Sequence, residues 1–136
     1  MKIMENLKVR DIMSRSVISV PMDAAVRNVI KTLSEEHISA IVVTAPDGSV
    51  MGIISEIDIV KAFNEDLDQL TAEDIMSDRV ITISPGSTVG DAADIMKKGG
   101  IHRLVITHER GHLGVPASPV GILSASDIIG WIAGKK

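Results

Sequence analysis

The sequence consists of two similar copies of one pattern, and this duplication constrains the fold more than any other feature. Residues 11–14 (DIMS) recur 63 positions later as residues 74–77, and residues 52–58 (GIISEID) recur as residues 121–127 (GILSASD). The offset grows to 69 in the second pair, so the second copy is six residues longer. The extra residues fall in a segment rich in Pro and Gly, residues 108–119, which is typical of a longer loop. A period of this length indicates a duplicated domain and not a solenoid of short repeats.

Each copy is predicted to form a short helix, a strand, a long helix, two strands and a closing helix. The long helix of the first copy is indicated by four apolar residues at helical spacing: Val26, Val29, Ile30 and Leu33. Two β-branched runs, residues 40–44 and 50–54, are joined by a turn sequence that is typical of a hairpin. We therefore expect an α/β (α+β) fold with a first repeat at residues 1–70 and a second at residues 71–136.

One copy is too small to be stable alone. A unit of about 60 residues buries only about 60% of the surface that its unfolded chain exposes. We therefore expect the two copies to pack against each other about an approximate two-fold axis and to form one structural domain.

The composition is that of a globular protein and argues against several classes of partner. Of the 136 residues, 45% are hydrophobic and 24% are charged, and the net charge is −4. With one Trp, one Phe and no Tyr, the chain lacks both the basic surface and the stacking aromatics typical of nucleic-acid binding. It has no cysteine for a disulfide, and no apolar stretch long enough for a signal peptide or a membrane helix. We expect a cytoplasmic protein for which membranes and nucleic acids are unfavourable partners.

The repeated phrase carries a Ser-x-x-Asp motif, Ser55 with Asp58 and Ser124 with Asp127. Before an apolar run, this motif is typical of a helix capping box, in which the serine accepts from a backbone N–H and the acid reaches back. Its predicted position after a sheet strand also suits an anion, because helix N-termini offer free N–H groups. A carboxylate can in addition accept two hydrogen bonds from a ribose diol. Capping and nucleotide binding therefore both remain open.

These features, in order and twice, resemble the tandem CBS-domain pair, a family named after cystathionine β-synthase. The resemblance runs from about Val9 to Ile132 and is carried by the two Asp-Ile-Met motifs, residues 38–43 and 101–106, and the two Gly-x-x-Ser-x-x-Asp phrases. It implies two β-α-β-β-α repeats, each preceded by a short helix, packed sheet to sheet with two ligand clefts between them. It also implies that adenine lies among apolar side chains, ribose on the aspartate, and phosphate near the serine and basic residues.

The resemblance further implies a set of ligand-binding residues for each cleft. For the first cleft these are Val17, Ser19, Ile38, Ala40, Ser55 and Asp58. For the second cleft they are Val80, Thr82, Ile101, His102, Arg103, Ser124, Ser126 and Asp127.

The two copies differ in chemistry at the start of the strand that follows the long helix. Ser39 and Ala40 stand in the first copy where the second copy has His102 and Arg103. A guanidinium and an imidazole both suit a phosphate, so these residues favour one cleft for phosphorylated ligands. Which cleft they serve stays open, and they could instead form an ordinary solvated strand end.

The sequence carries no sign of an enzyme. No pair of nucleophile and base and no acid dyad emerges from it. His108 and His112 have the chemistry of metal ligands, but the loop around Gly111 gives no helical face to align them, and structural zinc requires four ligands. We therefore expect no catalytic residue, no metal and no required cofactor.

We interpret the chain as a regulatory module that senses adenine nucleotides (AMP, ADP or ATP), with AMP as the expected ligand, and signals to a partner protein. Ile95 extends the apolar face of its helix, which together with the family resemblance predicts a homodimer. The alternatives are a structural dimerisation or scaffold module with vestigial clefts, a binder of S-adenosylmethionine or a dinucleotide, and a nucleic-acid binder.

Overall fold

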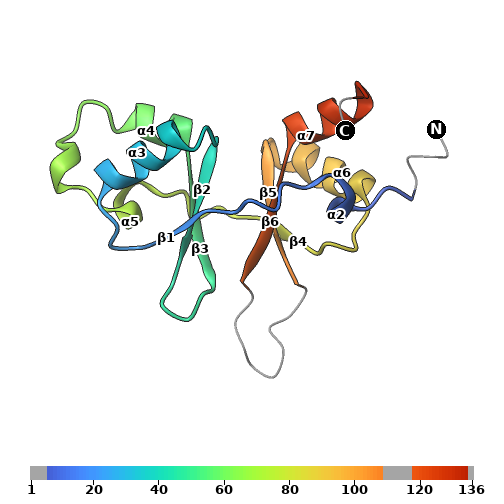
Figure 1. Cartoon of the computed structure of the whole chain (residues 1–136), viewed down its shortest axis with the longest axis horizontal. Coiled ribbons are helices and arrows are strands. Elements are labelled where there is room, and N and C mark those ends of the chain that lie inside the picture. The colour runs from blue at the N-terminus through green and yellow to red at the C-terminus, as the bar shows by residue number, and fades with distance from the viewer. Residues whose placement is uncertain (1–5, 109–117, 135–136) are drawn as a thin grey trace. The chain divides into compact units, whose positions relative to one another are not determined.

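The computed structural model describes residues 6–108 and 118–134, and its helices and strands follow the predicted order twice (Figure 1). The chain forms two compact units. One consists of Ile18–Val80 and is called here the continuous unit. The other combines Met1–Val17 with Ile81–Lys136 and is called the split unit.

The continuous unit is a three-stranded sheet with helices on one side of it (Figure 1). The strands are β1 (Ser19–Pro21), β2 (Ala40–Thr44) and β3 (Val50–Ser55). The helices are α3 (Val26–Glu35), α4 (Glu56–Lys61), the short 3-10 turn η1 (Leu67–Gln69) and α5 (Ala72–Ile75). Strand β2 lies in the middle, parallel to β1 and antiparallel to β3, so the predicted hairpin is present.

The split unit repeats this arrangement with the same strand order and directions. Its strands are β4 (Thr82–Ile83), β5 (Arg103–Thr107) and β6 (Pro119–Ser124). Its helices are α2 (Val9–Ile12), α6 (Val89–Gly99) and α7 (Ala125–Ile132). Mixed α/β structure with two three-stranded sheets confirms the predicted fold class. No helix within the described ranges is long and apolar enough to cross a membrane.

The middle strand of each sheet supplies the centre of a core. Ile41, Val42 and Val43 in β2 are fully buried, as are Leu104 and Ile106 in β5. A run of β-branched or leucine side chains is typical of a strand that is buried to this extent. The helices contribute the rest of each core through the predicted apolar positions, such as those that hold Val29 in α3 and Met96 in α6.

The two sequence repeats exchange their leading helices. Ser14, just after α2, pairs with Ile122 of β6 through two hydrogen bonds of 2.9 Å. Ser77, just after α5, pairs in the same way with Ile53 of β3, at 3.0 and 2.9 Å. The predicted boundary after residue 70 therefore separates the sequence repeats but falls inside the continuous unit.

A glycine in each repeated phrase makes this pairing possible. A Cβ atom on Gly52 would lie 2.5 Å from Met76 Sδ and 2.9 Å from the Ser77 carbonyl oxygen. On Gly121 it would lie 2.7 Å from Met13 Sδ and 2.9 Å from the Ser14 carbonyl oxygen. Real Cβ atoms essentially never come this close, so the backbone of the exchanged segment requires glycine here.

Ile95, from which a partner surface was predicted, is half-buried and packs against the core of the split unit. That part of the prediction is wrong, because the apolar strip that Ile95 adds to α6 points inward. The exposed large apolar side chains lie elsewhere, and those in the described residues are Met51, Ile57, Val60, Phe63, Ile129 and Ile132.

The ends of α3 and α6 differ in a way that predicts a stabilising substitution. His37 has a φ of 54° just after α3, whereas the equivalent position after α6 is Gly100, with a φ of 61°. The left-handed conformation costs a non-glycine residue about 1 kcal/mol or more. We expect His37→Gly to raise the free energy of unfolding by about 1 kcal/mol in urea denaturation.

Gly100→Ala is the matched control, since a Cβ atom there meets nothing within 4 Å. It should lower stability by a similar amount through backbone strain alone. A His37→Gly protein less stable than the wild type would contradict this explanation.

Candidate functional site

The candidate residues lie where the middle strand of each sheet begins and its hairpin partner ends. In the continuous unit Ala40, the first residue of β2, pairs with Ser55, the last residue of β3. In the split unit Arg103, which opens β5, pairs with Ser124, which ends β6. Because α4 and α7 begin at the next residue, the structure brings a serine and a helix start to the same end of each sheet.

The first strand of each sheet adds a hydroxyl on the other side of the middle strand. Ser19 opens β1 opposite Val42, and Thr82 opens β4 opposite Val105. Both hydroxyl residues are exposed and lie two positions along the middle strand from its first residue. Each unit therefore presents polar side chains on both sides of the start of its middle strand.

The Ser55 and Asp58 pair forms a capping box at the start of α4. The backbone N–H of Ser55 donates to Asp58 Oδ2 at 2.8 Å, and the Ser55 hydroxyl donates to the same oxygen at 3.1 Å. Both residues are half-buried. A carboxylate offers about four acceptor positions, and no hydrogen bond to Asp58 Oδ1 is formed by the residues that the structure describes. Asp58 can therefore cap its helix and accept further hydrogen bonds.

The same box opens α7 in the split unit. Ser124 N–H donates to Asp127 Oδ2 at 2.9 Å, and Asp127 N–H donates to Ser124 Oγ at 3.2 Å. The predicted capping role is thus confirmed for both motifs. A box with an aspartate at the third helical position also opens α5, where Thr71 N–H donates to Asp74 Oδ2 at 2.8 Å. Capping geometry alone therefore does not mark a ligand site.

His102 and Arg103 give the split unit a basic strand start that the continuous unit lacks. The His102 carbonyl oxygen accepts from Ala125 N–H at 2.9 Å, which ties the strand start to the first residue of α7. The His102 side chain is exposed, whereas Arg103 is half-buried and its Nε atom is fully buried. The guanidinium therefore extends from a fixed strand end beside the Ser124 box.

The other predicted residues are placed less centrally. Ile38 and Ile101 are half-buried and pack against the core of their own unit. Ser126 is exposed in the first turn of α7. Val17 and Val80 are the last residues before the chain passes from one unit to the other, so each belongs to a different unit from the residues of its predicted set.

Two further sequence interpretations can be compared with the structure. His108 is exposed just after β5, but Glu109 and His112 lie outside the described residues. No group of three or more His, Asp or Glu side chains suited to a metal occurs in the part of the chain that is described. The role of Gly52 and Gly121 in close packing was missed by sequence reasoning, although a glycine inside a strand is a known signal of close backbone approach.

A family model described as the CBS domain matches residues 9–65 and 72–134. The chain belongs to the CBS domain family. The two matched segments follow the sequence repeats, so the CBS pair predicted from the sequence is confirmed, while its compact units exchange their leading helices.

The relatives of this CBS pair support the same conclusion. An uncharacterised protein of Methanocaldococcus jannaschii is 29% identical over 92% of this chain and 90% of its own length. A second uncharacterised protein of that organism is 32% identical over 96% of this chain, which spans only 41% of that protein. The crystal structure of the CBS domain pair of protein MJ0100, in complex with 5′-methylthioadenosine and S-adenosyl-L-methionine, matches with a TM-score of 0.81 and 28% identity, over 95% of this chain and 98% of that one.

Proposed function

We propose that this CBS pair is a regulatory module that binds an adenosine-containing ligand and transmits its binding to a partner chain. The observation that carries the proposal is the meeting of Arg103, Ser124 and the Asp127 box at one end of the split unit's sheet. The ligands in the MJ0100 structure, both adenosine derivatives, support the same ligand class. Asp58 and Asp127 would accept hydrogen bonds from the ribose hydroxyls, and the flanking residues of each predicted set would surround the base.

Within this class, AMP is the ligand that we expect. A phosphate attracts a guanidinium because charge-assisted hydrogen bonds to a planar fork are strong and directional. Arg103 and His102 supply this chemistry in one unit only. Energy sensing through AMP, ADP or ATP follows from this expectation.

S-adenosylmethionine is a second candidate, and the MJ0100 complex favours it. This ligand shares the adenosine moiety but carries a sulfonium and a methionine carboxylate in place of the phosphate, whereas 5′-methylthioadenosine offers Arg103 no anionic group. A thermal-shift panel of AMP, ATP, adenosine, S-adenosylmethionine and 5′-methylthioadenosine separates the two candidates. A ligand at 100 times its dissociation constant adds about 2.7 kcal/mol to the free energy of unfolding. No shift with any adenosine compound would overturn the proposal and favour a scaffold module.

A matched pair of variants separates ligand binding from helix capping. Asp58→Ala and Asp74→Ala each remove a carboxylate that caps a helix of the continuous unit at 2.8 Å. Loss of such a cap costs about 1 kcal/mol, so both variants should lose similar stability. Only Asp58→Ala should weaken adenosine binding in calorimetry, by about tenfold, because it also removes a ribose acceptor. If both variants bind adenosine with equal affinity, Asp58 only caps its helix and does not contact the ligand.

We also propose that the module acts as a homodimer. The stripe of exposed apolar residues on α4, including Ile57 at 56% and Val60 at 65% exposure, supports a protein partner on the helix side of the unit. In the split unit, Ile129 of α7 is likewise an exposed apolar side chain, at 65% exposure. A regulated protein would then read the state of the dimer.

A further inference from the structure

Two short crossover segments carry the chain from one unit into the other. The first runs from Ser14, which pairs with β6, to Ser19 in β1. The second runs from Ser77, which pairs with β3, to Thr82 in β4. Backbone pairing fixes both ends of each crossover, because β1 and β4 are themselves in register with the middle strands. A displacement at one end must therefore be absorbed by only a few residues.

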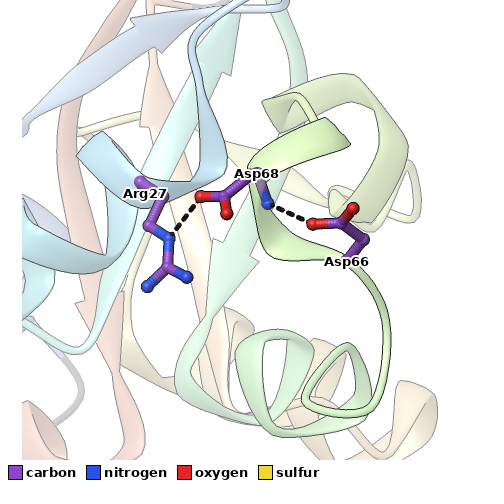
Figure 2. Close-up of polar contacts among 3 residues, drawn as sticks. All are labelled: Arg27, Asp66 and Asp68. Atoms are coloured by element: carbon purple, nitrogen blue, oxygen red, sulfur yellow. Dashed lines mark hydrogen bonds and ion pairs between the residues drawn. The ribbon is translucent and has the colours of Figure 1, made fainter.

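The helix before the second crossover is anchored independently of the bridge that follows it. Val26 N–H donates to the Leu70 carbonyl oxygen at 3.1 Å, just before α5. Figure 2 shows that Arg27 Nε donates to Asp68 Oδ1, at 2.8 Å, and that Asp68 N–H donates to Asp66 Oδ1, at 3.1 Å. These contacts tie the segment that precedes α5 to α3. If the bridge after α5 opens, we therefore expect the helix to stay in place and the change to pass into the crossover.

Each bridge lies beside the candidate site of its own unit. Ser77 pairs with Ile53, and β3 ends two residues later at Ser55, which caps α4. In the split unit the bridge is at Ile122, and β6 ends two residues later at Ser124, which caps α7. A ligand that contacts either capping box therefore acts on the strand end that holds the bridge.

The far end of each crossover carries residues of the other predicted set. Val80 and Thr82 follow the bridge of the continuous unit but belong to the set predicted for the second cleft. Val17 and Ser19 follow the bridge of the split unit but belong to the set predicted for the first cleft. Each crossover thus leads from the capping box of one set to the opening residues of the other.

We propose that the two crossovers couple the ligand sites, so that adenosine bound at one site raises the affinity of the other. This inference rests on the proposed function and adds its regulation. Each bridge is an isolated pair of hydrogen bonds at the outer edge of a three-stranded sheet, and such elements open locally at low cost. A ligand on the capping box favours the closed bridge. The closed bridge holds the crossover residues in place, so the second ligand has less of the chain to order.

Equilibrium dialysis with adenosine tests the coupling. Adenosine has no phosphate, so the charge of Arg103 does not make the two sites unequal. The wild type should bind two adenosine molecules per chain with a Hill coefficient of about 1.4 or more. For two like sites, this value corresponds to a second affinity that is about fivefold higher than the first.

Slackening both crossovers should abolish the cooperativity. Two glycines inserted after Arg15 and two after Asp78, both exposed positions, let each crossover absorb a displacement. This variant should still bind two adenosine molecules, with a Hill coefficient of about 1. The matched control carries two glycines after Asp47, which is exposed in the turn between β2 and β3, and should bind adenosine as the wild type does.

Hydrogen exchange in Asp58→Ala tests whether a ligand in one unit affects the bridge of the other. Because its ribose acceptor is removed, the continuous unit stays largely empty at adenosine concentrations that fill the split unit. Adenosine should nevertheless slow the exchange of Ser77 N–H, which donates to the Ile53 carbonyl oxygen at 2.9 Å, by about fivefold or more. Gly48 N–H, which donates to the Ala45 carbonyl oxygen in the β2–β3 turn, should exchange at its unliganded rate.

The outcomes separate the coupling from the proposed function. If the wild type binds two adenosine molecules without cooperativity, or only one, the coupling is wrong and the proposed function stands. Cooperativity that persists in the variant with both insertions travels by another route, such as contact between copies, and also overturns the inference. Unchanged exchange at Ser77 has the same consequence, and it does not depend on the insertions. If no adenosine binds to the wild type, the proposed function itself is wrong.

Discussion

Arg103→Ala is expected to weaken AMP binding about ten- to a hundredfold while leaving adenosine binding nearly unchanged. A charge-assisted hydrogen bond is worth about 1.5–3 kcal/mol, which corresponds to this range of affinity. The effect should be confined to phosphorylated ligands, because adenosine has no group that needs a guanidinium. Arg103 extends from the first residue of β5, opposite Ser124, so its removal acts at the phosphate end of the proposed site.

The same substitution should simplify the binding curve. Ala40 holds the equivalent strand position in the continuous unit, so only one strand start supplies a guanidinium. Isothermal titration of the wild type with AMP should resolve one tight phase and one weak or silent phase, and Arg103→Ala should abolish the tight phase. Arg103→Lys keeps the charge without the planar fork and should fall between the two. If Arg103→Ala binds AMP as tightly as the wild type does, residues 101–103 have no role in phosphate binding and only form the start of a strand.

Gly52→Ala and Gly121→Ala are expected to destabilise the protein more than any other substitution considered, by about 2–3 kcal/mol each. The added methyl group would overlap a methionine sulfur and a backbone carbonyl oxygen within 3 Å. A methionine side chain can move, but the carbonyls of Ser77 and Ser14 are held by paired backbone hydrogen bonds. We expect the added methyl group to push the segment at Ser77 or Ser14 away from the strand with which it pairs. Urea denaturation followed by circular dichroism measures this loss.

Gly130→Ala is the control for these two substitutions. Gly130 lies inside α7, and a Cβ atom there meets nothing within 4 Å. Alanine is the better helix former by about 1 kcal/mol, so this variant should be as stable as the wild type or more stable. Loss of stability at Gly52 that is no greater than at Gly130 would contradict the close-contact explanation.

The fold was predictable from the sequence because the spacing of apolar residues in each repeat indicates where its helices and strands lie. Val29 in α3 and the run from Ile41 to Val43 in β2 are buried as their periodicity predicts. The second copy repeats the pattern in the same order, at an offset that grows from 63 to 69 residues, so each element is indicated twice. Such local patterns are reliable because the apolar residues that indicate a helix or strand are also the residues whose burial stabilises it.

The exchange of leading helices was not predictable in this way. Residues 11–14 and 74–77 are identical in sequence, so nothing in them distinguishes which sheet each segment joins. The choice depends on long-range pairing of Ser14 with Ile122 and of Ser77 with Ile53. Sequence periodicity indicates local secondary structure, but it does not indicate which distant segments of the chain pair with each other.

The candidate site was predictable in part. The Ser-x-x-Asp motifs do cap helices, as their spacing indicated, and Arg103 does lie beside one of them. The error at Ile95 has a physical reason: an extra apolar residue on a helix can widen its buried face as readily as it can form a second one.

The exchange of leading helices also sets the order in which the protein can fold as it is synthesised. The continuous unit is complete once residue 80 has been made, whereas the split unit needs its first and last segments together. At about 5–20 residues per second, α2 waits on the order of ten seconds for β6 and α7. Helix α2 is thus translated long before the segments that it packs against, and Ile12 lacks its core partners in β6 and α7 until those elements have been made.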